Sequence, residues 1–319
     1  MNDHPSFPFD LDRVLGEIED STRIMVLGGM DTGKTTLIRK LHGKLGGLVI
    51  DGDLGQSEIG PPGLISLGTY ETGMKDGYFV GSFTPRGNLV QVMTGIARLV
   101  NRDPKRCFVD TDGWIDGEAA RVYKGELISL VDPDVLLLLQ REDELEKFST
   151  YLSGDKVVNL KAQKLEEKSR GERSANRVRK FKFYFSRSRR IKKGWKELKI
   201  AGTLLGRGGK IPSPQLEKAL RGEVTAGWKC ENTLTVISSS QPDSRSELKE
   251  KFSVKRIEHH PTTDLKYRLV GCYQDGKFAG EGTITGLSSD GIEILTPEQE
   301  FNQVRPGKKR VKPSGRTIK

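Results

Sequence analysis

Cysteine, aromatic residues and long apolar runs are all scarce in this chain of 319 residues. Its three cysteines, Cys107, Cys230 and Cys272, lie far apart with no CxxC pair, which argues against a disulfide framework and a cysteine zinc site. No stretch approaches the ~18 apolar residues that a membrane span requires. The first ten residues, MNDHPSFPFD, lack a basic region followed by an apolar run. We therefore expect a cytoplasmic protein that makes no contact with a membrane.

Positive charge is plentiful but concentrated in one segment. The net charge is +10 and the isoelectric point is near 9.4. Between Lys156 and Lys199 there are 17 Lys and Arg against 4 Asp and Glu, a net of +13, so the other 275 residues together carry −3. A solvated helix face is usually mixed in sign, so this segment is expected to meet phosphate groups, with simple solvation as the alternative.

Apolar runs that alternate with helical patterns predict an α/β fold. The run from Arg23 to Leu27 ends in glycines and is followed by a helical pattern from Lys34 to Leu45. Two further runs end at Asp51 and Asp110, and a fourth covers Val135 to Leu139. Strands that are apolar throughout and alternate with helices indicate a doubly wound, mostly parallel sheet covered on both sides, as in P-loop NTPases.

The pattern of apolar residues in the sequence changes after Pro212. Short apolar runs follow, with turn signals at Asp275-Gly276 and Asp290-Gly291, which is typical of a smaller β-rich domain. We therefore predict a P-loop domain over 1–212 that includes the basic segment 156–199, and a β-rich domain over 213–305. The remaining residues, 306–319, are basic and poor in apolar side chains, so we expect a flexible tail.

The segment GGMDTGKT fits the phosphate-loop pattern GxxxxGK[ST] and lies between a predicted strand and a predicted helix. Curled backbone N–H groups and the helix N-terminus would bind phosphates, Lys34 would reach the β- and γ-phosphates, and Thr35 would hold Mg²⁺. A glycine turn that spells the pattern by chance is the alternative. The expected nucleotide-binding residues are Gly28, Gly29, Met30, Asp31, Thr32, Gly33, Lys34, Thr35 and Thr36.

Three aspartates follow predicted strands. Asp51 and Asp53 close the second run, and Asp110 closes the third. Because the carboxyl ends of parallel strands face the ligand crevice, each could hold Mg²⁺, and Asp53 could instead accept the proton of an incoming hydroxyl. For Asp51 and Asp53, ordinary turn-forming aspartates are the alternative. The expected metal ligands are Thr35, Asp53 and Asp110, partly through water.

Two other features can be interpreted in two ways. Trp114 follows a glycine where the crevice rim is expected, so it could stack on a nucleic-acid base or belong to the core. Arg173 and Arg177 follow Lys168 and Arg170 at helical spacing. Such a helix could close over the phosphates as a lid, or its arginines could be solvated surface.

Five motifs in order resemble those of polynucleotide 5′-hydroxyl kinases. They are GGMDTGKT, DGDLGQSEIGPPG, TPRGN from Thr84 to Asn88, VDTDGWIDG and RSANRVRKFKFYF, and together they span roughly residues 20 to 210. This family includes the kinase subunit of the eukaryotic pre-mRNA cleavage complex, the nucleolar pre-rRNA kinases and archaeal counterparts. The cleavage-complex proteins carry a β domain before the kinase core, whereas about twenty residues precede the first predicted strand here.

The resemblance implies a role for each matching position. Asp53 matches the general base, Arg173 the main lid arginine and Arg177 a second one. With Lys34, the first two make up the expected catalytic set, and Arg177 joins the nucleotide-binding residues. The resemblance also implies substrate contacts from Gln56, from Thr84 and Asn88 of a substrate clasp, and from Trp114.

The expected reaction is transfer of the γ-phosphate of ATP, with GTP also possible and Mg²⁺ as cofactor. The acceptor is expected to be the 5′-hydroxyl end of a single nucleic-acid strand, RNA favoured over DNA, with no obligate protein partner. A nucleotide-dependent switch without a phosphorylated acceptor is the main alternative. A kinase for a small metabolite is less compatible, because it gives no use for so basic a segment.

Overall fold

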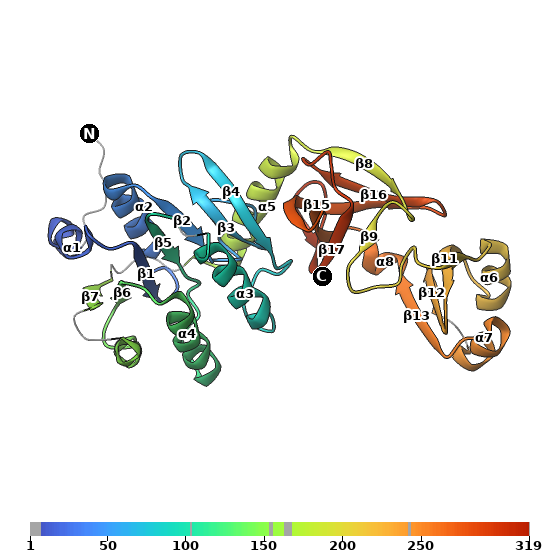
Figure 1. Cartoon of the computed structure of the whole chain (residues 1–319), viewed down its shortest axis with the longest axis horizontal. Helices are drawn as coiled ribbons and strands as arrows, with labels where there is room; N and C mark the ends of the chain where they lie inside the picture. The colour runs from blue at the N-terminus through green and yellow to red at the C-terminus, as the bar shows by residue number, and fades with distance from the viewer. Residues whose placement is uncertain (1–7, 103, 153–155, 163–167, 242–243, 319) are drawn as a thin grey trace. The chain divides into compact units, whose positions relative to one another are not determined.

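Figure 1 shows the computed structural model of the chain, which describes residues 8–102, 104–152, 156–162, 168–241 and 244–318. The chain divides into two compact units, Met1–Arg177 and Val178–Lys319, which we call unit 1 and unit 2. Within the described residues, no helix has the length and apolar character needed to cross a membrane.

Unit 1 is built on a seven-stranded sheet with the strand order β4-β3-β2-β5-β1-β6-β7. β2, β5, β1, β6 and β7 run parallel, and β3 and β4 are antiparallel additions beside β2. The predicted α/β fold with a mostly parallel sheet is therefore confirmed. The strands are β1 (Arg23–Gly28), β2 (Leu48–Asp51), β3 (Leu64–Thr69), β4 (Gly73–Phe79), β5 (Cys107–Asp110), β6 (Val135–Gln140) and β7 (Val157–Lys161).

Both faces of this sheet are covered. Met25 and Leu27 of β1 belong to one hydrophobic cluster, together with residues of α3 and α4. Ile24 and Val26 point to the opposite face and pack with residues of α1 and α2. This alternation explains why the strand is apolar at every position. The helices are α1 (Leu11–Ile18), α2 (Lys34–Leu45), α3 (Leu89–Val100), α4 (Glu118–Val131) and the 3₁₀ helix η1 (Glu146–Tyr151).

The basic segment 156–199 is not one element. It contains β7, the helix α5 (Arg170–Phe185) and the strands β8 (Arg189–Gly194) and β9 (Lys199–Ile200), while residues 163–167 lie outside the described residues. At the start of α5, the Ser169 Oγ accepts from the Glu172 backbone N–H at 3.2 Å, and the Glu172 carboxylate accepts from the Ser169 N–H at 2.7 Å. This reciprocal capping box fixes where the helix begins.

Unit 2 contains two further sheets. One has the path β18-β17-β14-β15-β16-β8 with β9 paired to β17, and the other has the order β10-β11-β12-β13. Their remaining strands are β10 (Gly209–Lys210), β11 (Val224–Cys230), β12 (Thr233–Ser238), β13 (Arg256–Pro261), β14 (Arg268–Gln274), β15 (Lys277–Leu287), β16 (Gly291–Thr296), β17 (Gln303–Val311) and β18 (Thr317–Ile318). The helices are α6 (Ser213–Leu220), α7 (Arg245–Phe252) and α8 (Thr262–Leu265).

Two expectations about the domains do not hold. β8, β9 and β10 lie before residue 212 but pair within the sheets of unit 2, so the predicted boundary of the P-loop domain, 1–212, and the start of the β-rich domain, 213–305, are both too late. The flexible tail predicted for 306–319 is also wrong over its described part. β17 pairs with β14, and Val304 and Val311 are fully buried, so a few apolar side chains anchor a strand that is otherwise rich in charge.

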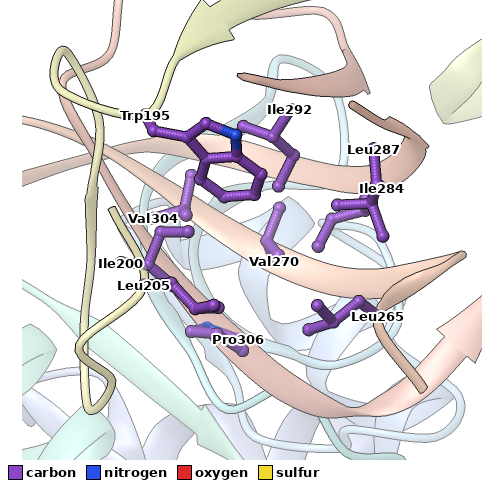
Figure 2. A pocket seen from close by; sticks show the side chains of 10 residues that line it. All are labelled: Trp195, Ile200, Leu205, Leu265, Val270, Ile284, Leu287, Ile292, Val304 and Pro306. Atoms are coloured by element: carbon purple, nitrogen blue, oxygen red, sulfur yellow. The ribbon is translucent and has the colours of Figure 1, made fainter. Parts of the chain in front are cut away.

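One of the two hydrophobic clusters of unit 2 contains two tryptophans. The rings of Trp195 and Trp228 pack edge to face, with centroids 4.9 Å apart. Figure 2 shows Trp195 beside nine other side chains around a cavity of about 10 Å³. All ten lining residues are apolar, so this cavity is a packing gap and offers no polar partner to a ligand.

Candidate active site

The phosphate loop follows β1 and has a tightly curled backbone. A Cβ at Gly28 would lie 2.6 Å from the Thr32 hydroxyl and 2.9 Å from the Leu139 carbonyl oxygen, so only glycine fits there. Gly33 and Asp31 adopt positive φ angles of 94° and 53°. The Thr32 hydroxyl donates to the Gly29 carbonyl at 3.0 Å and closes the loop. Such a loop before a helix N-terminus presents backbone N–H groups to an anion.

Lys34 and Thr35 begin α2 directly after this loop. Lys34 is buried, and its Nζ donates to the Gly29 carbonyl at 2.7 Å. Burial lowers the pKa of Lys34, while the charges of Asp110 and Asp53 oppose that shift. The lysine thus lies within electrostatic reach of both acids. Thr35 points its hydroxyl at the Asp110 carboxylate, with 2.7 Å between Oγ1 and Oδ2, whereas Thr36 in the same turn is exposed.

Asp51 and Asp110 lie side by side at the carboxyl ends of β2 and β5. Asp51 is saturated with hydrogen bonds. Its Oδ2 accepts from the Ser57 hydroxyl and from the backbone N–H groups of Glu58 and Ile59, and its Oδ1 accepts from the Asp53 N–H. Burial also raises the pKa of Asp51. The structure therefore gives Asp51 the turn-forming role that the sequence left open.

Asp53 is arranged differently from Asp51. Its Oδ1 accepts from the backbone N–H groups of Gly55 and Gln56 at 2.9 and 3.0 Å. Its Oδ2 accepts no hydrogen bond from the described residues, and the side chain is only half-buried. One carboxylate oxygen of Asp53 thus holds its own loop, and the other is available to a ligand.

Asp110 carries an unsatisfied oxygen that fits a cation. Its Oδ1 is buried and has no hydrogen-bond partner among the described residues. Burial, aided by the charge of Asp51, raises the pKa of Asp110 to about 7. The described part of the chain contains no group of three acidic, cysteine or histidine side chains that could enclose a metal by itself. Mg²⁺ usually takes one or two carboxylates together with phosphate oxygens and water, so this donor set fits Mg²⁺ that arrives with a nucleotide.

The segment TPRGN is shaped from within by Asn88. This side chain is buried, and its Nδ2 donates to the Ser82 hydroxyl and to the carbonyl oxygens of Thr84 and Arg86 at 3.0–3.1 Å. The Thr84 hydroxyl accepts from the Arg86 N–H at 3.3 Å. Both predicted clasp residues therefore hold the loop in its shape. Arg86, which the sequence did not single out, is exposed at its tip.

Trp114 shows both of the features that the sequence left open. It packs against the hydrophobic core and stacks on Tyr123, with ring centroids 6.0 Å apart. It is also partly exposed, and the guanidinium of Arg86 lies 4.8 Å from its ring centroid. The Arg86 guanidinium thus lies over the face of the Trp114 ring, where a nucleic-acid base would stack.

A buried ion pair fixes the backbone before Trp114. The Nζ of Lys124, fully buried in α4, donates to the carboxylate and to the carbonyl oxygen of Asp112, both at 2.9 Å. The Tyr123 hydroxyl donates to the same carboxylate, and the Asp112 Oδ1 accepts from the Trp114 N–H. No sequence motif marks this pair. A lysine within an otherwise apolar helix face was the available signal.

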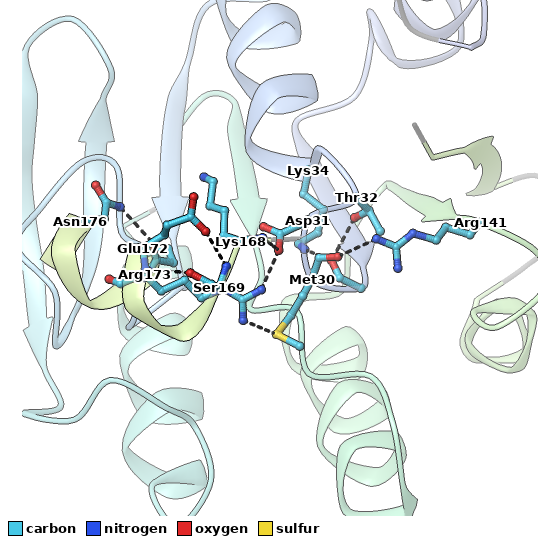
Figure 3. A network of polar contacts seen from close by, with 12 residues as sticks. Met30, Asp31, Thr32, Lys34, Arg141, Lys168, Ser169, Glu172, Arg173 and Asn176 are labelled. Carbon is cyan, nitrogen blue, oxygen red and sulfur yellow. Dashed lines mark hydrogen bonds and ion pairs between the residues drawn. The ribbon is translucent and has the colours of Figure 1, made fainter. Parts of the chain in front are cut away.

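The lid arginines reach the loops of unit 1 at two different places. Figure 3 shows that Arg173 pairs with Asp31 of the phosphate loop, at 2.6 Å between Nη2 and Oδ2. Arg177 lies over the ring of Phe83, at 5.4 Å from the centroid, and its buried Nε has no partner among the described residues. Burial lowers the pKa of Arg177, and the charge of Asp53 opposes this. The charge of Asp53, the expected general base, thus acts on Arg177, the second lid arginine.

Gln56 links the lid to the acid loop. Its amide donates to the Arg173 carbonyl oxygen at 3.3 Å and accepts from the Asn176 amide at 2.9 Å. The structure thus gives Gln56 a contact with the lid helix, and its expected contact with substrate stays a prediction.

The chain is similar to known proteins in both sequence and fold. The family model described as "mRNA cleavage and polyadenylation factor CLP1 P-loop" matches residues 28–187. A polyribonucleotide 5′-hydroxyl-kinase of Methanocaldococcus jannaschii is 29% identical over 98% of this chain and 94% of its own length. One of Pyrococcus horikoshii is 28% identical over 95% of this chain and 90% of its own. A solved chain from the wild-type Clp1p–Pcf11p complex has the same fold, with a TM-score of 0.60 at 16% identity, over 94% of this chain and 78% of that one.

Proposed function

The chain belongs to the family of the mRNA cleavage and polyadenylation factor CLP1 P-loop, and from this premise we propose that it is an ATP-dependent polynucleotide 5′-hydroxyl kinase. The relatives that match nearly its whole length are named polyribonucleotide 5′-hydroxyl-kinases, which favours RNA as the acceptor. The observation that carries the proposal is the available Oδ2 of Asp53, whose charge acts on the phosphate-loop lysine, Lys34.

The chemistry follows from this juxtaposition. The loop amides and Lys34 hold the triphosphate, and Asp53 accepts the proton of the 5′-hydroxyl as its oxygen bonds to the γ-phosphorus. The bond between the γ-phosphorus and the oxygen that bridges the β- and γ-phosphates breaks, and ADP leaves with the electron pair of that bond. Because the transition state of phosphoryl transfer is loose, positioning and charge neutralisation supply most of the rate.

Thr35 and Asp110 would hold Mg²⁺, with Asp53 contributing through water. When bound, Mg²⁺ neutralises charge on the phosphate oxygens. Its arrival would also supply the positive partner that the buried Asp110 Oδ1 lacks.

Recognition of a strand end is supported by features of both units. In unit 1, Trp114 and the exposed Arg86 offer an aromatic face and a cation to the terminal nucleotide. In unit 2, 30 Lys and Arg stand against 15 Asp and Glu, a net of +15. A positive surface of this kind favours the phosphates of a strand, and a small metabolite would have no use for it.

The test is transfer of label from ATP labelled at the γ-phosphate to an oligoribonucleotide with a 5′-hydroxyl end. We expect labelled strand from the wild type, none when the same strand already carries a 5′-phosphate, and none from Lys34→Ala. Matched DNA and nucleoside acceptors, each with ATP or GTP, define the preferences. Steady release of inorganic phosphate without a labelled strand would reject the proposal in favour of a nucleotide-dependent switch.

A further inference from the structure

Asp31 of the phosphate loop is bonded to the lid. Its Oδ2 accepts from the Arg173 Nη2 at 2.6 Å and from the Lys168 backbone N–H at 3.1 Å, as Figure 3 shows. The two side chains of the ion pair are only 17% and 21% exposed. An ion pair this sheltered is screened less by solvent than a surface pair, and loss of one partner leaves the other charge without compensation.

One guanidinium nitrogen of Arg173, Nη1, makes a weak hydrogen bond. Among the described residues, its Nη1 donates only to the thioether sulfur of Met30, at 3.1 Å. Thioether sulfur is a weak acceptor, and the Met30 side chain is 53% exposed, so it is free to move. A phosphate oxygen bound in the loop can therefore replace the sulfur at Nη1 while Nη2 stays on Asp31.

The backbone of Arg173 is held independently of its side chain. The Gln56 amide donates to its carbonyl oxygen, and the Gln56 N–H in turn binds the Asp53 Oδ1. The lid helix is thus attached to both the phosphate loop and the acid loop. With the main chain of Arg173 fixed by Gln56 and one guanidinium nitrogen fixed by Asp31, the direction of the remaining nitrogens is determined.

We propose that Asp31 is a positioning residue that directs Arg173 at the γ-phosphate, so that the site distinguishes a nucleoside triphosphate from a diphosphate. The inference rests on the proposed function for the identity of the nucleotide, but it does not depend on which acceptor is phosphorylated. It assigns to the fourth residue of the loop a task separate from that of the loop amides.

The experiment measures binding of ADP and of a non-hydrolysable ATP analogue, each with Mg²⁺, by titration calorimetry. Asp31→Asn is the informative variant, because Asn also tolerates the positive φ of this position. We expect Asp31→Asn and Arg173→Ala each to lower the preference for the analogue over ADP by about tenfold, the size of a lost charge-assisted hydrogen bond. The double variant should lower it no further than Arg173→Ala alone, since both act through one contact.

Asp132→Asn is the matched control, because Asp132 is exposed, has a φ of 45° and lies at the end of α4. It should leave the preference unchanged. Independent, additive losses in the double variant would overturn the inference, as would a normal preference in Asp31→Asn. Tighter analogue binding by Asp31→Asn would show that Asp31 competes with the phosphate for Arg173. A wild type that prefers the analogue but labels no strand would refute the proposed function while leaving this inference standing.

Discussion

Unit 1 and unit 2 carry net charges of opposite sign. Residues 178–319 have a net charge of +15, whereas residues 1–177, with 23 Lys and Arg against 28 Asp and Glu, have −5. Yet the phosphate loop belongs to the acidic unit. The difference shows two separate ways of binding phosphate: a few donors held in fixed directions around Lys34, and a general excess of positive charge that attracts a polyanion without directing it.

Two fully buried ionisable side chains, one from each unit, are accommodated in different ways. In unit 1, Lys124 is fully buried and paired with Asp112. In unit 2, Glu281 of β15 is fully buried, and neither carboxylate oxygen has a partner among the described residues. Burial therefore raises the pKa of Glu281 well above its ordinary value. Lys124 is thus stabilised by its ion pair with Asp112, whereas burial favours the neutral, protonated form of Glu281.

The largest expected effect is on the rate of phosphoryl transfer and comes from Asp53 of unit 1. Asp53→Asn should lower the rate of phosphoryl transfer about 10³-fold, the range of a lost general base, because Asn cannot accept the proton. Affinity for the oligonucleotide should stay within about twofold, since that attraction depends on positive charge elsewhere. Single-turnover kinetics and a binding titration measure the two quantities. Asp76→Asn, on β4, serves as control, and a wild-type rate in Asp53→Asn would remove it from the mechanism.

Next in size is the buried pair of unit 1. Lys124→Met leaves the Asp112 carboxylate buried without a cation, and we expect the free energy of unfolding to fall by about 3 kcal/mol. Adding Asp112→Asn should restore part of that loss, because both charges are then absent. Calorimetric unfolding of the three proteins decides this. If the single variant is as stable as the wild type, the pair does not stabilise the fold.

Stacking by Trp114 comes third. Trp114→Ala should raise KM for the oligonucleotide by about tenfold, in keeping with the free energy of base stacking, while kcat changes little. Trp114→Phe should retain most of the affinity. Thermal unfolding is measured alongside, because Trp114 also touches the core. A drop in stability with no change in KM would assign this residue to the core alone.

The unpaired acid of unit 2 predicts a pH dependence. Between the ordinary pKa of a glutamate and the raised pKa of folded Glu281, the unfolded chain is ionised and the folded chain is not, so stability falls as pH rises. Relative to Glu281→Gln, the wild type should lose up to about 1.4 kcal/mol of unfolding free energy per pH unit as pH rises above the ordinary glutamate pKa of about 4.3. Denaturant unfolding in a Trp114→Phe background leaves Trp195 and Trp228 as reporters of unit 2. Parallel pH curves would contradict the prediction.

The smallest effect is expected from single surface charges of unit 2. Lys308 lies within β17 and Lys312 directly follows it, and both side chains are exposed. Replacing both with alanine should reduce the slope of log affinity against log salt by roughly 0.7 for each strand phosphate they contact. Lys44→Ala combined with Lys75→Ala, two exposed lysines of unit 1, is the control. Equal changes in both pairs would mean that net charge, and not unit 2, attracts the strand.

The motif-bearing parts of the fold could be predicted because their chemistry is local. The phosphate loop, β1 and α2 follow from glycine spacing and one apolar run, and the structure forms them at those positions. α4 was not predicted, because Lys124 and Gly125 interrupt its apolar face. β17 was mistaken for a tail, because its many charges conceal the spacing of Val304 and Val311.

Contacts between distant residues could not be predicted. Asp31 and Arg173 are separated by 142 positions, and nothing in either local sequence names its partner. The same holds for the assignment of the two lid arginines. Arg173 was expected at the transferring phosphate and Arg177 among the nucleotide-binding residues, but which one pairs with the loop and which one lies near Asp53 depends on how α5 packs.

The capping box at Ser169 fixes the start of α5 and therefore the position of each later residue along the helix. Because the first turn is set by Ser169 and Glu172 themselves, every later side chain keeps its place along the helix axis. Arg173 and Arg177 are four residues apart, about 6 Å of helical rise. The helix α5 thus sets the distance between Arg173, which pairs with Asp31 of the phosphate loop, and Arg177, on which the charge of Asp53 acts. Inserting or deleting a single residue between them would rotate Arg177 about the helix axis by about 100° relative to Arg173, so the two arginines could not keep both contacts.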